Sequence, residues 1–103
     1  MTQFIAERHL LFSEKNDGSR KNLTIRVSAP SVVKPEAVNF PVDGVASVCR
    51  VEVIGLTEYS HDVHGMDSMQ AINLASDIES LIRRLSSNYD IFWATGEPYF
   101  DEV

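Results

Sequence analysis

Apolar and polar residues alternate along three stretches of the chain, and this period of two predicts three β-strands. The stretches are residues 4–13, 23–28 and 45–54. Between the first two lies a polar segment with Asp17-Gly18, a strong turn signal, so we expect these two strands to form a hairpin. The more apolar set of the first strand is expected to face the core: Phe4, Ala6, Arg8, Leu10 and Phe12.

Three further segments are less regular. Residues 29–44 contain Pro30, Pro35 and Pro41, and because proline removes a ladder donor they predict an extended loop with at best an edge strand. Residues 56–63 suit a polar edge strand. Residues 91–94 are short and apolar and predict a last strand, followed by an aromatic and acidic tail.

After residue 66 the apolar spacing changes to three and four, which predicts one amphipathic helix from about Asp67 to Ser87. Asp67 is the expected N-cap, and Gln70 would complete a capping box. Gly65 would let the chain turn sharply before the helix. The predicted apolar stripe consists of Met69, Ile72, Ala75, Ile78, Leu81, Ile82 and Leu85.

These elements predict an α+β fold in a single domain of residues 1–103, with an antiparallel sheet of four to five strands and the helix packed on one face. The helix should cover Leu23, Ile25, Val27, Cys49, Val51, Val53 and Trp93. Cys49 is the only cysteine, which excludes an intrachain disulfide, and its apolar surroundings predict a buried, inert thiol.

Composition narrows the function classes. Hydrophobic residues make up 44% of the chain and charged residues 23%, as in ordinary globular proteins, and the formal net charge is −6. That charge disfavours nucleic acids and anionic membranes and would speed encounter with a basic partner. The sequence shows no signal-peptide pattern and no apolar run of about 18 residues, so the expected location is the cytoplasm.

Metal-capable side chains cluster at His61, Asp62 and His64. On a strand, His61 and His64 would point to opposite faces, and no known catalytic, phosphate-binding or zinc motif surrounds them. The sequence therefore favours a binding protein over an enzyme, with no cofactor. A small metal-dependent or hydrolytic enzyme using His61 and His64 is kept as an alternative.

Carboxylates and aromatic rings mix near the C-terminal end, a composition that can anchor a basic protein partner. Together with the polar segment before the helix, this end supplies the candidate partner-binding residues. They are Glu58, His61, Asp62, His64, Asp90, Glu97, Tyr99, Phe100, Asp101 and Glu102. A homodimeric structural or regulatory module, paired through a sheet edge, is a further alternative.

Three segments carry a resemblance. They are Arg8-His9-Leu10, the run from Gly65 to Ala75 that includes Gly-Met-Asp-Ser-Met-Gln-Ala, and Gly96-Glu97-Pro98-Tyr99. The chain resembles a group of small bacterial proteins with these segments, a likeness that implies no activity and no catalytic residues.

In type rather than in motif, the chain is also similar to immunity proteins of bacterial toxin systems such as contact-dependent growth inhibition. That likeness implies a small acidic cytoplasmic domain that occludes the active site of a cognate toxin, here expected to be a nuclease.

Overall fold

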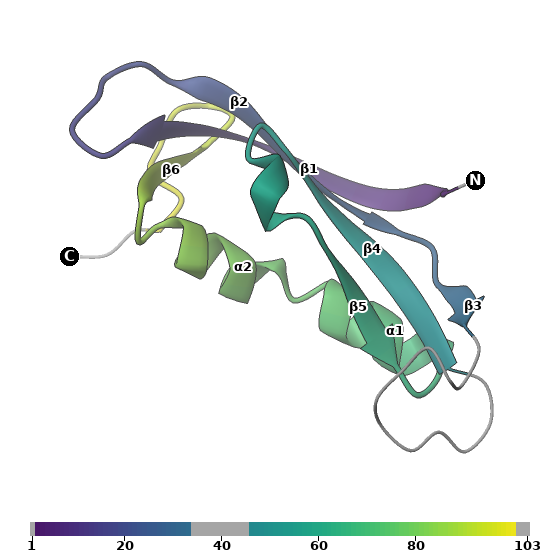
Figure 1. Cartoon of the computed structure of the whole chain (residues 1–103). Helices are drawn as coiled ribbons and strands as arrows, with labels where there is room; N and C mark the ends of the chain where they lie inside the picture. Colours follow the sequence, from purple (N-terminus) through teal and green to yellow (C-terminus); the bar gives the residue numbers. More distant parts are fainter. Residues whose placement is uncertain (1, 34–45, 101–103) are drawn as a thin grey trace.

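An antiparallel sheet of six strands carries a layer of helix on one face (Figure 1), which confirms the predicted α+β class. The computed structural model describes residues 2–33 and 46–100. The strands are β1 (Phe4–Glu14), β2 (Lys21–Ser28), β3 (Ser31–Val33), β4 (Ala46–Ile54), β5 (His61–Gly65) and β6 (Tyr89–Trp93). The main order is β5-β4-β2-β1-β6, and β3 pairs with the start of β4 on the β2 side.

The predicted hairpin of β1 and β2 is confirmed, with registered pairs from Phe4 to Phe12. Its turn is closed by a hydrogen bond from the N–H of Asp17 to the carbonyl of Glu14 (3.0 Å). The residue with positive φ is Asn16 (66°), not Gly18. Asparagine tolerates this left-handed conformation better than most residues, so it can replace glycine there.

The strand β1 is covered unequally along its length. β2 pairs with it almost throughout, whereas β6 pairs only with residues from Leu10 to Glu14. We call residues 10–14 the closed half of β1 and residues 4–9 the open half. Within the described part of the chain, no strand lies beside the open half on the β6 side.

The helical layer lies where the sequence predicts it, from residue 68 to residue 85, but it is interrupted. It consists of α1 (Ser68–Ala75) and α2 (Ile78–Leu85), separated by Ser76 and by Asp77, whose ψ of 64° is not helical. Serine and aspartate compete with the helical backbone for hydrogen bonds and favour such breaks.

The cap of α1 is close to the prediction. The carboxylate of Asp67 accepts from the N–H of Gln70 (2.8 Å), as expected of an N-cap. The side-chain oxygen of Gln70 reaches back to the N–H of Met66 (2.6 Å) rather than to that of Asp67, so the capping box is shifted by one residue.

The two helices pack at different depths, and this difference explains the interruption. α2 buries the large side chains of Leu81, Ile82 and Leu85, whereas α1 buries only Ala71 and Ala75. An axis packed through alanines lies closer to the sheet than one packed through leucines, so one straight helix cannot satisfy both faces.

Gly65 marks how closely α1 approaches β5. A Cβ atom on Gly65 would lie 2.4 Å from the backbone nitrogen of Ala71, too close for any side chain. Gly65 is therefore required by this close approach, not by a sharp turn. The predicted stripe is wrong at its first two positions, because Met69 is 79% exposed and Ile72 38% exposed.

The core is otherwise the predicted one, with Ile25, Val51 and Val53 buried between sheet and helix. Cys49 is buried as expected, and burial raises the pKa of its thiol. The expectation that the helix covers Trp93 is wrong, because its side chain is 39% exposed and stacks on Tyr99 instead.

The predicted strand of residues 56–63 begins later than expected. Residues Thr57–Tyr59 form a short 3-10 turn, and β5 starts only at His61. Among the described strands, β5 pairs with β4 alone, so it is an edge strand, as predicted. Residues 34–45, which contain most of the predicted proline-rich loop and the first residue of the third predicted strand, lie outside the described residues.

Candidate functional site

An apolar groove of about 260 Å³ opens between the open half of β1 and the junction of α1 with α2. Its floor is the apolar face of β2, mainly Val27, and its walls include Ile5 of β1 with Ile72 and Ile78 of the helices. The side chain of Ile5 is 53% exposed. Contiguous apolar surface exposed to water is uncommon in folded proteins and often marks a site where another molecule binds.

A β-bulge turns β1 toward this groove. Ala6 pairs with Val27, whose side chain faces the helices, whereas Phe4 pairs with Ser28, and the register shifts between them. Ile5 is the extra residue of the bulge and lines the groove with Ala6. Phe4 lies on the other face, where the guanidinium of Arg26 stands 3.9 Å from its ring centre.

One end of the groove is closed by a polar cluster centred on Arg8. Its guanidinium contacts the carboxylate of Glu79 (3.0 Å) and the hydroxyl of Tyr99, which also bonds to Glu79. The Arg8 group also lies 5.5 Å from the ring centre of Trp93. The cluster fastens β1 to α2 and to the C-terminal segment at the point where β6 ends.

Burial and the bond to Glu79 raise the pKa of Tyr99. The phenol therefore stays protonated at neutral pH, and its O–H donates a hydrogen bond to the Glu79 carboxylate. Arg8 supplies the compensating positive charge, so the three polar groups satisfy one another at the end of an apolar groove.

The outer side of β6 shows which of its backbone groups face β1. The N–H of Trp93 donates to the carbonyl of Glu97 (2.8 Å), and the carbonyl of Ile91 accepts from the N–H of Tyr99 (2.9 Å). Backbone groups alternate in direction along a strand, so those of Phe92 point toward β1.

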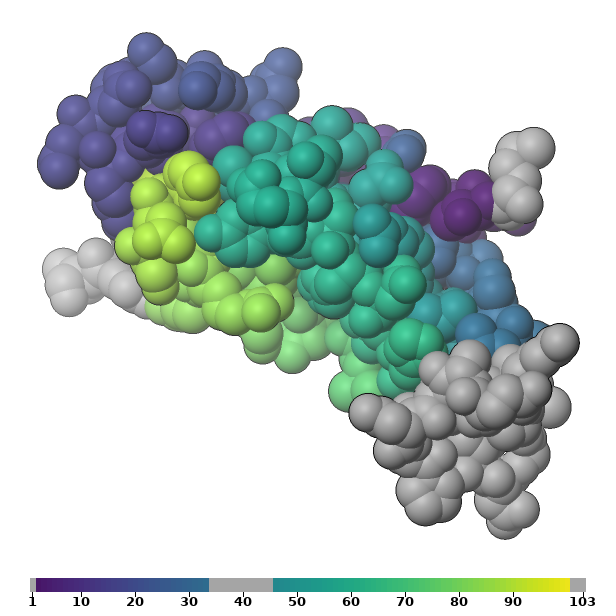
Figure 2. All heavy atoms as spheres, in the orientation of Figure 1, coloured from purple at the N-terminus to yellow at the C-terminus, as the bar shows by residue number. Residues whose placement is uncertain are grey.

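Phe92 pairs with Leu11, which consequently directs its N–H and C=O toward β6. By the same alternation, His9 and Glu7 direct their backbone groups to that side as well. No strand of the described residues lies there, so the open half presents backbone donors and acceptors next to the apolar groove. In Figure 2 the first residues of β1 lie at the margin of the molecule, away from the yellow-green C-terminal segment.

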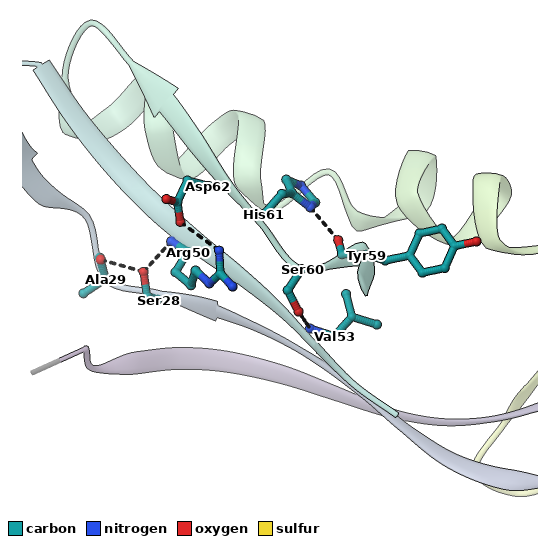
Figure 3. A network of polar contacts seen from close by, with 8 residues as sticks. All are labelled: Ser28, Ala29, Arg50, Val53, Tyr59, Ser60, His61 and Asp62. Carbon is teal, nitrogen blue, oxygen red and sulfur yellow. Dashed lines mark hydrogen bonds and ion pairs between the residues drawn. The ribbon is translucent and has the colours of Figure 1, made fainter. Parts of the chain in front are cut away.

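The predicted residues of β5 lie on a different part of the sheet. Figure 3 shows Asp62 bonded to Arg50 (3.2 Å) and the Nδ1 atom of His61 facing the carbonyl of Tyr59 (2.9 Å). Each of these polar groups has a structural partner. Glu58 is exposed in the 3-10 turn that precedes β5.

His61 and His64 do not converge. His61 is half-buried and lines a small pocket with Leu81 of α2, whereas His64 is exposed and lies three residues further along the same strand. Among the described residues, no three histidine, cysteine, aspartate or glutamate side chains are placed to hold a metal ion.

The predicted C-terminal surface is only partly available. Tyr99 is 8% exposed, so little of its side chain is accessible to a partner, and its role as an anchor stays a prediction. Phe100 is half-buried with the guanidinium of Arg83 3.9 Å from its ring centre, and Asp90 forms an ion pair with Lys15 (3.2 Å).

Glu97 is exposed, and a hydrogen bond from the Thr95 hydroxyl lowers its pKa. Asp101 and Glu102 lie outside the described residues.

The sequence does not single out the groove, although it holds one signal for it. The first predicted strand spans ten residues and the last only four, so a last strand paired with the first would leave much of it uncovered. Which strand lies beside which is a property of the fold. The alternation predicts that Phe4 faces the core, but the bulge places Ile5 there instead.

Comparisons with protein-family models, with curated proteins and with solved structures found no match to this chain. The two resemblances described above therefore remain hypotheses. None of the helices in residues 2–33 and 46–100 is long and apolar enough to cross a membrane.

Proposed function

We propose that this chain is a protein-binding module that acts in stoichiometric amounts, as an immunity protein that neutralises a cognate bacterial toxin. The observation that carries this proposal is the open half of β1 beside the apolar groove. Unpaired backbone groups and exposed apolar side chains in one place are a surface that another polypeptide can cover.

The charge of the chain supports a basic partner. The formal net charge is −6, Glu79 lines the groove, and the carboxylate of Glu7 lies on the outer face of the open half beside His9. A nuclease that binds phosphates carries cationic groups around its active site. An acidic protein would be steered to such a cleft and would occlude it, with carboxylates in place of the substrate phosphates.

The direct test is a neutralisation assay. A basic nuclease domain encoded beside this gene would be mixed with increasing amounts of the protein while its nuclease activity is followed. We expect activity to fall linearly and to vanish near a one-to-one ratio. A nuclease that stays active, and that shows no binding at nanomolar concentrations, would contradict the proposal.

A homodimeric module is the second candidate, because the open half of one copy can pair with the same edge of another copy. Sedimentation equilibrium over a wide concentration range separates the two functions. A dimer that persists at low micromolar concentration favours this second candidate, and a monomer favours a different partner.

A further inference from the structure

We infer that the open half of β1 binds its partner by strand addition, and that the added segment alternates apolar and basic side chains. This inference rests on the proposed function and specifies how it is carried out. The segment would run antiparallel to β1 and follow the line that β6 would take if it continued past Trp93.

The backbone of the open half is ready for such a strand. Glu7 and His9 present two N–H donors and two C=O acceptors to the vacant side, while β2 holds the opposite side of the same residues. An added strand would exchange hydrogen bonds with both residues, and these bonds are independent of the side chains.

The groove selects the side chains of one face of the added strand. Side chains that alternate toward the helices would enter the space between Ile5, Ile72 and Ile78. The cluster of Arg8 and Glu79 closes the groove at one end and already satisfies its own charges. The inward positions of the partner are therefore apolar, with valine or isoleucine as suitable sizes.

The outer face selects basic side chains. The carboxylate of Glu7 is half exposed there and contacts the ring of His9 (3.0 Å). A lysine or arginine opposite Glu7 would form a cross-strand ion pair. The net charge of −6 favours the same choice over the whole approach of the partner.

A second copy of this chain fits the same edge less well. Within the open half, two symmetric antiparallel registers use the backbone groups of Glu7 and His9. One register places Glu7 opposite Glu7, and the other places Arg8 opposite Arg8. Like charges directly opposite each other destabilise a strand pair, and each copy carries a net charge of −6.

The test uses a capped nine-residue peptide in which valine alternates with lysine, titrated into the 15N-labelled protein. We expect the amide signals of Glu7 and His9 and those lining the groove to shift. A matched peptide with glutamate in place of lysine should bind at least about tenfold more weakly, the equivalent of one lost charge interaction of about 1.4 kcal/mol.

Two variants at one position isolate the backbone contribution. Glu7→Pro removes the donor that faces the vacant side and leaves the ladder with β2 intact, whereas Glu7→Ala removes only the carboxylate. We expect Glu7→Pro to bind the lysine peptide at least about fivefold more weakly than Glu7→Ala, since it loses a backbone hydrogen bond of about 1 kcal/mol.

Several outcomes would overturn the inference. They are signal shifts confined to β5 or to the C-terminal segment, no binding at millimolar peptide, equal binding by Glu7→Pro and Glu7→Ala, or a homodimer that Glu7→Pro abolishes. The neutralisation assay distinguishes failure of the proposed function from failure of strand addition. A toxin neutralised equally by the wild-type protein and by Glu7→Pro would leave the function standing and reject strand addition, and peptide binding without neutralisation would do the reverse.

Discussion

The two halves of β1 belong to one continuous strand, yet their surroundings differ on every side. The closed half has β2 on one edge, β6 on the other and the large side chains of α2 beneath it, so Leu10 and Phe12 are buried. Among the described residues, the open half has β2 on one edge and no strand on the other, and beneath it lie the α1–α2 junction and the groove.

This difference shows that hydrophobic side chains alone do not decide which part of a strand becomes core. Ile5 in the open half is as apolar as Leu10 in the closed half, but it is 53% exposed while Leu10 is 2% exposed. What differs is the length of β6 and the depth of the helix below. The closed half contributes to the core, and the open half leaves apolar surface exposed.

The largest expected effect separates the two helices with one matched pair of substitutions. Leu85→Ala in α2 empties a fully buried position and should cost about 2–5 kcal/mol of the free energy of unfolding. Leu74→Ala in α1, where the side chain is 50% exposed, should cost less than about 1 kcal/mol. Urea denaturation measures both, and similar losses would show that α1 packs as tightly as α2.

Proline substitutions probe the two edges in the same way. Leu11→Pro removes an N–H that faces β6, so it should destabilise the protein by about 2–3 kcal/mol more than Leu11→Ala. The N–H of Glu7 faces no strand of the described residues, so the free energy of unfolding of Glu7→Pro should differ from that of Glu7→Ala by less than about 1 kcal/mol. Thermal unfolding of the four variants measures these differences. Equal losses of stability at both positions, each relative to its alanine variant, would contradict the prediction.

The boundary between the halves should respond to alkaline pH. The raised pKa of Tyr99 means that the unfolded chain loses this proton first, near the ordinary value of 10, so stability is full below that pH and falls as pH rises toward the folded pKa. Tyr99→Phe should cost about 1 kcal/mol at pH 7 and flatten the decline between pH 9 and 11. Unfolding curves at several pH values test this, and parallel declines would contradict it.

The smallest expected effect concerns the helix caps. Asp67→Ala removes the side-chain bond to the first turn of α1 and should cost about 1 kcal/mol. Asp77 makes no such bond to the backbone of α2, so Asp77→Ala should cost only a few tenths of a kcal/mol. Denaturation midpoints with unchanged slopes would show the difference, and a reversed order would mean that α2 depends on its cap more than α1 does.

Much of the fold was predictable because its signals are local. A period of two located the strands, a period of three and four located the helical segment, and Asp67 marked its start. The interruption at Ser76–Asp77 is not predicted by the sequence pattern, because the apolar positions continue across it. It results from the depth of packing, which depends on Gly65 and Ala71 meeting in space.

The candidate site was largely unpredictable because it is formed by contacts between segments distant in sequence and contains no sequence motif. Arg8 and Tyr99 are 91 residues apart in sequence and become partners only through the β1–β6 pairing. Of the polar residues of β5, Asp62 bonds to Arg50 of β4, and His61 contacts the carbonyl of Tyr59 in the preceding turn. The groove exists because no strand of the described residues pairs with the open half on the β6 side, and the apolar pattern of a strand does not show which strands lie beside it.

The pairing of β1 with β6 also has a consequence for the order of folding. It joins the first and last strands of the described chain, whereas β4, β5 and α1 are close in sequence. Distant segments meet late because closing a long loop costs entropy before any contact is gained. We expect pulsed hydrogen exchange to protect the amides of β4 before that of Leu11. Before β6 pairs, all of β1 would resemble its open half, so the open half is the part of β1 whose surroundings change least when β6 is added.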